Sequence, residues 1–262
     1  MADSRTGQLW LLTVGSLLAL FVITAVLAMV DRRLLDGASV WAKPLKFELS
    51  IALHFGTLVL VVGALGPAWR NGTLLWVVGV AASAATVFEM AYILLQAGRQ
   101  QASHFNLDTP LHATLYGLMA AGAVVITLAA ALVGVVAWID GEAGFGAGTR
   151  LGIGLGLAGG ALLTLVAGFA IGGALGHHVG VEPAGGARMF LTGWSLTVGD
   201  RRVPHFFATH MMQALPLAGL IADKVLPPAV AQLAVAATAI AWTIVTIALL
   251  QQAGAGLPIY RG

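Results

Sequence analysis

The stretch GDRRVPHFFATHMMQALP, residues 199–216, carries more reactive side chains than a helix that only crosses lipid requires. The part after Pro204 is predicted to be a transmembrane helix. The ionisable and polar members of the stretch are Asp200, Arg201, Arg202, His205, His210 and Gln213. Polar groups at membrane depth are costly, so they mark either a functional site or a buried pair. The stretch therefore predicts a polar site near one membrane face, without naming a reaction.

Glu89 is the sharpest single candidate elsewhere in the chain. It lies in an apolar segment, roughly two helical turns from its end. An isolated carboxylate in lipid is very unfavourable, so Glu89 should be paired, protonated or bound to a metal. The partners expected within reach are Lys46, His54, His205 and His210. A structural ion pair explains Glu89 as well as a functional role does.

The composition is that of a polytopic membrane protein. Of the 262 residues, 59% are hydrophobic and 9% are charged, whereas soluble domains carry about a quarter charged residues. At roughly 20 apolar residues per span, the length accommodates about seven helices and no soluble domain. We therefore expect an all-α fold in which residues 1–262 form a single domain of seven transmembrane helices.

Two further features exclude classes of function. Cysteine is absent, which excludes disulfides, thiolate zinc sites, Cys-ligated iron–sulfur clusters, covalently attached haem and a Cys nucleophile. The net charge is only +2 and the basic residues are not clustered, so nucleic acid is not expected as a partner.

The spans predicted from the apolar runs cover residues 9–30, 44–65, 74–97, 110–138, 151–175, 204–222 and 228–250. Pro216 is expected to kink the sixth span. The longest connection, residues 176–203, has a length typical of functional or disordered loops. The segment GLGLAG, residues 154–159, matches G-x-G-x-x-G formally, but it lies inside an apolar span. We interpret it as small residues that allow close helix packing.

Seven spans place the two termini on opposite sides of the membrane. The N-terminal side, here called side A, carries four basic residues: Arg5, Arg70, Arg150 and Lys224. The opposite side, side B, carries the other nine. The positive-inside rule then makes side B cytoplasmic. We expect a bacterial inner-membrane protein with its N-terminus outside and its C-terminus inside.

Histidines gather on side B. Six of the seven are predicted there: His104, His112, His177, His178, His205 and His210. His54 lies about 15 Å inside the second span, near the bilayer midplane. His205 and His210 are five residues apart, about 140° around a helix, so they cannot chelate one ion as an i, i+4 pair does. An interfacial loop with capping residues would produce the same clustering.

Four phrases occur together on side B. They are WAKPLKFELS (41–50), EMAYILLQAGRQQASHFN (89–106), GHHVGV (176–181) and GWSLTVGDRRVPHFFATHMMQALP (193–216). Their combination resembles an uncharacterised bacterial family of seven-span membrane proteins. The resemblance implies a shared site on side B and attaches no activity to it.

The leading hypothesis is a membrane-embedded, metal-dependent enzyme, a hydrolase or oxidoreductase, that acts on a lipid-soluble or amphipathic substrate. Imidazole and carboxylate ligands suit zinc or non-haem iron. The expected metal ligands are His104, His177, His205, His210 and Glu89. The catalytic candidates are Glu89, Asp200 and His210. The residues expected to bind substrate are Lys43, Lys46, Arg99, Asn106, Arg202 and Gln213. The expected partners are the bilayer, the substrate and a second copy of the chain.

Three alternatives stay open. The first is a b-type cytochrome with His54 and His210 as axial ligands of haem. The second is a proton-coupled transporter or anion-binding protein in which Glu89 titrates and the basic residues bind the anion. The third is a small scaffold whose side-B loops bind a partner protein.

Overall fold

The computed structural model describes residues 4–260, and nearly all regular structure in them is helical. Within these described residues, six helices are long and apolar enough to cross a membrane. They are α1 (Arg5–Val30), α2 (Ala42–Gly63), α4 (Thr73–Gly98), α5 (Pro110–Ile139), the continuous helix Ala147–Gly173 and α9 (Pro228–Gly254). This agrees with a helical membrane protein. The sixth predicted span is the helix α8 (Arg202–Val225), which is not among the six and which carries the polar stretch described above.

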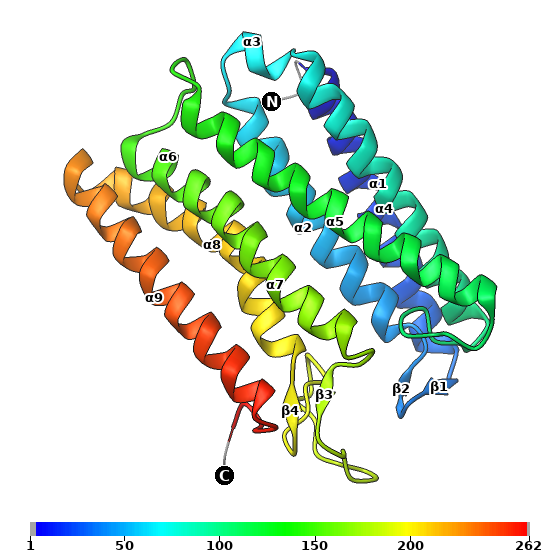
Figure 1. Cartoon of the computed structure of the whole chain (residues 1–262). Helices are drawn as coiled ribbons and strands as arrows, with labels where there is room; N and C mark the ends of the chain where they lie inside the picture. The colour runs from blue at the N-terminus through cyan, green and yellow to red at the C-terminus, as the bar shows by residue number, and fades with distance from the viewer. Residues whose placement is uncertain (1–3, 261–262) are drawn as a thin grey trace. The chain divides into compact units, whose positions relative to one another are not determined.

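The chain divides into two compact units, the first ending at Gly144 and the second beginning at Phe145. The first unit contains α1, α2, α4 and α5, with the short helix α3 (Pro67–Arg70) between α2 and α4. The second contains α6 (Ala147–Ile153), the π-helix η1 (Gly154–Gly159), α7 (Gly160–Gly173), α8 and α9 (Figure 1). That the two units together form the single domain expected from the sequence stays a prediction.

Within the first unit, α1 packs along α2 and against α4, and α4 packs against α5. Trp10 of α1 is fully buried, meets the ring of Phe55 edge-on at 5.7 Å, and donates from Nε1 to the carbonyl of Gly79 at 3.3 Å. Only 11% of the most apolar window of α1 is buried inside the chain, against 44% for α2, α4 and α5. Most of α1 is therefore available to lipid.

The side-B end of the first unit is tied together by polar contacts. The strands β1 (Leu34–Leu35) and β2 (Ala38–Ser39) form a short antiparallel hairpin. Arg33 donates from Nη1 to the carbonyl of Gly98, and Gln100 donates from Nε2 to the carbonyl of Leu34. The hairpin therefore lies against the end of α4. The hairpin was not expected from the sequence, because its two-residue strands are too short to show a pattern.

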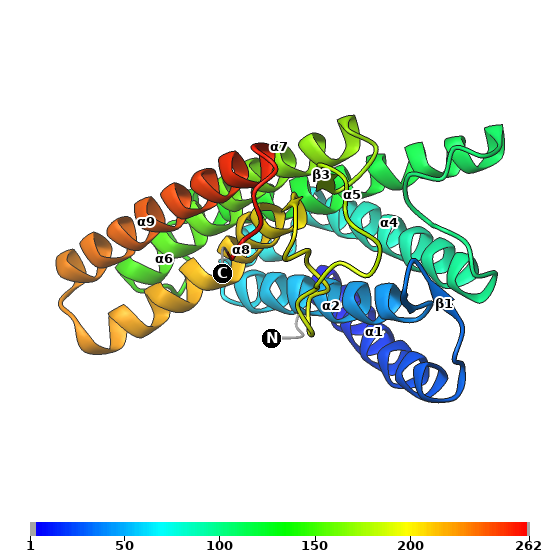
Figure 2. The same ribbon diagram turned by 90° about the horizontal axis from the view of Figure 1, so that it is seen from below.

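In the second unit, α8 packs against α6, η1, α7 and α9 (Figures 1 and 2). Glycines in α6 and η1 permit this packing. A Cβ atom at Gly152 would meet the carbonyl oxygen of Leu215, and one at Gly156 would lie 2.8 Å from Cδ of Pro216. The expectation that GLGLAG serves close helix packing is confirmed. The backbone of this segment is a π-helix, a local widening that lies opposite the ring of Pro216.

Asp223, in the last turn of α8, fixes the start of α6. Its Oδ1 accepts from the N–H of Gly148 at 2.8 Å, and its Oδ2 accepts from the N–H and the hydroxyl of Thr149 at 2.7 and 2.6 Å. The N-cap residue Gly146 has no side chain to perform this role. Asp223 therefore satisfies N–H groups that every helix start leaves without an intrahelical partner.

We predict opposite effects for two glycine-to-alanine substitutions. G152A should lower the free energy of unfolding by about 1–3 kcal/mol, the usual cost of overpacking, because the methyl group would meet the carbonyl of Leu215. G117A is the control, since a Cβ atom there has nothing within 4 Å and alanine is the better helix former by about 1 kcal/mol. Thermal unfolding in detergent compares them, and equal melting temperatures would contradict the packing argument.

Candidate functional site

The buried face of α4 carries a polar stripe inside an otherwise apolar helix. Its members are Ser83, Thr86, Glu89 and Gln96. Glu89 is 3% exposed, and its Oε2 has no hydrogen-bond partner among the described residues. Its Cγ and Oε1 lie just beyond the backbone of Gly122 in α5, where a Cβ atom would approach them to 3.8 and 3.9 Å. The side chain of Glu89 is thus buried where α4 packs against α5.

Lys43, in the first turn of α2, supplies the positive charge that acts on Glu89. Its Nζ lies 5.7 Å from the centre of the Phe47 ring. The sequence suggested other partners for Glu89, among them Lys46 and His54. Lys46 is exposed, whereas the charge of Lys43 lies close enough to Glu89 to act on its carboxyl group. Lys43 was expected to bind substrate, and in the structure it is also the electrostatic partner of the central acid.

His104, in the loop between α4 and α5, lies in an aromatic surrounding. Its ring centre is 5.6 Å from that of Phe47, 6.2 Å from that of Phe105 and 6.0 Å from that of Tyr116. Burial, and secondly the positive charge of Lys43, lower the pKa of His104 to about 3. The imidazole is therefore neutral at physiological pH, the form that can accept a proton or a hydrogen bond.

Two other expected substrate-binding residues lie near this loop. The side chain of Asn106 is buried, and it donates to the carbonyl of Ala102 at 3.1 Å and accepts from the N–H of Asp108 at 3.2 Å. These bonds shape the loop itself. Arg99 follows α4 as its C-cap residue and is exposed. The structure therefore supports a structural role for Asn106 and leaves Arg99 accessible.

The structure shows a second buried acid that the sequence analysis missed. Glu48 of α2 is fully buried. Its Oε1 accepts from the hydroxyl of Thr24 in α1 at 2.7 Å, and its Oε2 has no hydrogen-bond partner among the described residues. The sequence did contain a signal for this acid. Glu48 lies about one turn after Pro44, the predicted start of the second span, and so it is an acid inside an apolar segment, as Glu89 is.

His54 is buried between α2 and α5 and bonds the backbone of Ile126. Its Nε2 has no hydrogen-bond partner among the described residues. The arrangement matches the helix–helix hydrogen bond that is the simplest explanation of a lone membrane histidine.

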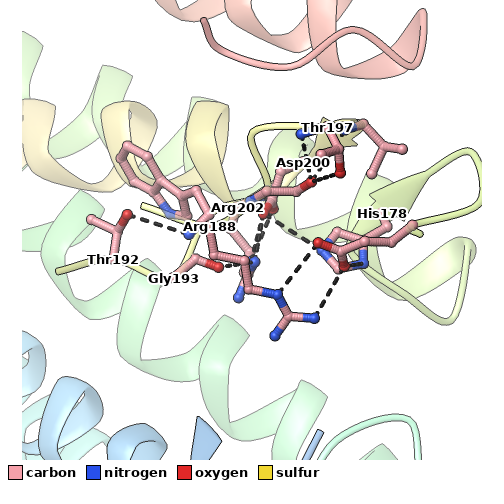
Figure 3. Close-up of polar contacts among 11 residues, drawn as sticks. His178, Arg188, Thr192, Gly193, Thr197, Asp200 and Arg202 are labelled. Atoms are coloured by element: carbon pink, nitrogen blue, oxygen red, sulfur yellow. Dashed lines mark hydrogen bonds and ion pairs between the residues drawn. The ribbon is translucent and has the colours of Figure 1, made fainter. Parts of the chain in front are cut away.

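In the second unit, the loop between α7 and α8 is organised around Asp200 (Figure 3). The strands β3 (His178–Val179) and β4 (Gly199–Asp200) pair at its base. The carboxylate of Asp200 is fully buried, and it accepts from the N–H of Ser195 at 2.9 Å and from Nε and Nη2 of Arg202 at 2.9 and 2.5 Å. Burial acts to raise the pKa of Asp200, but the bonds and charge of Arg202 prevail and lower it.

Further contacts between charged and ionisable side chains connect Asp200 to the rest of this loop. His178 Nδ1 lies 2.9 Å from Oε2 of Glu182, and its Nε2 lies 3.7 Å from Oδ2 of Asp200. Arg188 binds the same Glu182 at 3.2 Å. Burial lowers the pKa of His178 despite both carboxylates, and it lowers that of His177 to about 4. The geometry favours a structural role for Asp200 and Arg202 over the catalytic and substrate-binding roles suggested by the sequence.

His205 and His210 face different neighbours, which agrees with the prediction that they do not chelate one ion as an i, i+4 pair does. His205 bonds the backbone of Thr164 in α7, and its ring lies beside Gly168. His210 directs Nδ1 to the carbonyl of Phe206 at 3.0 Å and stacks on that ring at 3.9 Å. Gln213, one turn further on, is half-buried. Neither histidine requires a metal to explain its position.

The five expected metal ligands are divided between the units. Glu89 and His104 belong to the first, and His177, His205 and His210 belong to the second. Within residues 4–260, no three His, Asp or Glu side chains are grouped so that they could hold a metal ion. The metal centre and the haem pair of His54 and His210 stay predictions.

Comparison of the chain with protein-family models, with curated proteins and with solved structures found no match. The resemblance to a bacterial seven-span family on side B therefore stays a prediction. The site has to be interpreted from its own geometry.

We predict that Asp200 stabilises the loop between α7 and α8. D200N keeps the shape of the side chain but removes the charge that binds Arg202. The free energy of unfolding should fall by about 1.5–3 kcal/mol, the range for a hydrogen bond to a charged group. D108N is the control, because Asp108 is exposed and such changes alter stability by about 0.5 kcal/mol or less. If both variants melt alike, the ion pair does not hold the loop.

We also predict a pH dependence that originates at His104. The pKa is about 3 in the folded protein and about 6.5 in an unfolded chain. The unfolded state therefore binds more protons between these values, so the free energy of unfolding decreases as the pH falls below about 6.5 and is unaffected above it. H104Q should lose less stability than the unsubstituted protein between pH 7 and pH 4. Melting curves with parallel pH dependence would contradict this assignment.

Proposed function

We propose that the chain is a seven-span protein of the bacterial inner membrane that binds a proton at Glu89 together with an anionic, lipid-soluble or amphipathic substrate at Lys43. The N-terminus would be outside and the C-terminus inside. This is the proton-coupled alternative among the sequence-based hypotheses. The observation that supports it best is the buried carboxyl group of Glu89, on which the charge of Lys43 acts and one oxygen of which has no hydrogen-bond partner among residues 4–260.

The seventh span in this proposal is α8. Its neighbours on both sides are helices of the second unit, so its polar groups do not have to face lipid. Those groups also bond internally: the hydroxyl of Thr209 donates to the carbonyl of His205 at 2.8 Å, and the hydroxyl of Thr164 in α7 donates to Thr209. Polar residues in spans characteristically face the bundle interior and pair with one another or with backbone carbonyls.

The burial of Glu89 supports the binding of a proton. An ionised carboxylate in apolar surroundings is stable only with a partner that is both charged and hydrogen-bonded. Lys43 supplies charge, yet Oε2 accepts no hydrogen bond from any described residue. A proton on Glu89 removes the unfavourable charge and leaves the ammonium group of Lys43 available to another anion.

Proton binding and substrate binding would be coupled, because the carboxylate of Glu89 and the substrate anion compete for the ammonium group of Lys43. With Glu89 protonated, the ammonium group binds the acidic group of a substrate. When Glu89 loses its proton, its carboxylate pairs with Lys43 and displaces the substrate anion. The proton and the anion are thus bound together and released together. Arg99 and Lys46, both exposed on side B, would attract the anion to the site.

The metal-dependent enzyme remains a second hypothesis and the b-type cytochrome a third. Imidazole and carboxylate groups of the required types are present, but among residues 4–260 no three His, Asp or Glu side chains are grouped so that they could hold a metal ion, and His54 and His210 belong to different units. The proton-coupled hypothesis needs only Glu89 and Lys43, two side chains of the first unit whose charges act on each other.

We predict that infrared difference spectroscopy detects a protonated carboxyl group at Glu89. The carbonyl stretch of a protonated carboxylic acid should be present in the reconstituted protein at neutral pH. The difference between the spectra of the unsubstituted protein and E89Q should contain this band. A difference spectrum that shows only carboxylate bands would refute a proton on Glu89.

Two further variants make the test specific. E142Q changes an exposed acid in the turn after α5, and its difference spectrum should lack the protonated-acid band. E48Q should remove a separate band, because Glu48 is also buried with one unpartnered oxygen. An intact fold in each variant is checked by its melting temperature.

A further inference from the structure

The loop between α7 and α8 carries a tight hairpin with an apolar tip. Arg188 and Ser195 form its base as an antiparallel bridge. The N–H of Met189 donates to the carbonyl of Trp194 at 2.9 Å, and the N–H of Gly193 donates back to the carbonyl of Met189 at 2.8 Å. At the turn, Phe190 is fully exposed and Leu191 is 80% exposed. We call these two residues the hairpin tip.

The hairpin is held firmly by α8. Nη2 of Arg202 donates to the carbonyl of Gly193 at 2.8 Å while the same guanidinium binds Asp200 (Figure 3). The buried ring of Trp194 meets the ring of Phe206 edge-on at 5.3 Å. Arg202 and Phe206 therefore hold the C-terminal side of the hairpin against α8, and the two apolar side chains of the tip remain exposed.

The charges around the tip are unequally exposed. The acidic side chains are hidden, with Glu182 11% exposed and Asp200 fully buried. The guanidinium groups remain partly accessible, with Arg188 40% and Arg202 32% exposed. The surface beside the tip thus exposes guanidinium groups, each paired with one of these less exposed carboxylates, as well as apolar side chains. This combination complements a bilayer interface, in which anionic head groups lie above acyl chains.

The position of the hairpin in the chain places it near such an interface. It follows the apolar helix that ends at Gly173, one of the six long enough to cross a membrane. Phe169, about one turn before that end, is 66% exposed, and Val181, just after β3, is 91% exposed. Exposed apolar side chains therefore continue from the span into the loop.

We propose that the hairpin tip inserts into the interfacial layer of the lipid bilayer, with Arg188 at the level of the phosphate groups. Phe190 and Leu191 would lie at the boundary of the acyl chains, as aromatic and apolar residues of membrane interfaces do. The inference requires the helix ending at Gly173 to cross the membrane. It does not depend on proton binding at Glu89.

The absence of cysteine from the chain makes a single-site label possible. F190C is labelled with the environment-sensitive dye NBD and reconstituted into vesicles of phosphatidylcholine and phosphatidylglycerol. Quenching is measured with lipids that carry a nitroxide at a shallow position of the acyl chain, and separately with aqueous iodide. The proposal predicts strong quenching by the shallow nitroxide and weak quenching by iodide.

Two control sites calibrate the measurement. A184C labels another exposed position of the same loop that has no large apolar side chain, and it should be quenched more by iodide than F190C. F169C labels the exposed face of α7 and should be quenched by nitroxide lipids. Without quenching at F169C the helix does not lie in lipid, and the inference fails with its premise.

The remaining outcomes are equally decisive. If iodide quenches F190C as strongly as A184C, the tip lies in water and the proposal is wrong. If neither quencher reaches F190C while F169C responds to lipid, protein covers the tip, and a second copy of the chain or another part of it replaces the bilayer as the occupant. Either result leaves the assignment of Glu89 untouched, because the infrared test examines a different unit.

Discussion

A carboxyl group in apolar surroundings must be neutral or matched by a positive charge, and the first unit meets this requirement twice. The charge of Lys43 acts on Glu89, while Glu48 accepts from the hydroxyl of Thr24, the one hydrogen-bond donor to its side chain found among residues 4–260. Both acids are buried. The second unit solves the same problem differently, since Asp200 is fully bonded by Arg202 and backbone N–H groups. One oxygen of Glu89 and one of Glu48, by contrast, have no hydrogen-bond partner among residues 4–260.

Close helix packing makes a polar helix compatible with an apolar environment. The glycines that face Leu215 and Pro216 allow the backbones of α6 and α8 to approach closely, and α9 covers another face of α8. Without this approach, the histidines and threonines of α8 would have to meet lipid or water. The glycine-rich segment therefore has a role in positioning the polar groups of α8, although none of its residues carries a reactive side chain.

The sequence predicted the helices and the burial of Glu89 well, because both follow from the distribution of apolar residues along the chain. It also indicated that His205 and His210 cannot chelate one ion as an i, i+4 pair does, since this follows from their spacing on a helix. It did not identify Lys43 as the partner of Glu89 or the hydrogen bond that Glu48 receives, because both depend on how separate helices are placed side by side. The hairpins and the charge network in the loop depend on contacts too short or too irregular to leave a periodic pattern.

The unequal polarity of the helices also has a consequence for biogenesis. An apolar helix such as α1 can partition into the bilayer as soon as it leaves the ribosome, because little of its surface is buried inside the chain. The polar α8 lacks that independence, and its neighbours in the folded unit are the helices synthesised immediately before and after it. We therefore expect α8 to integrate into the membrane together with its neighbours. In that case α6 and α7 remain next to the insertion machinery until α8 and α9 have been synthesised.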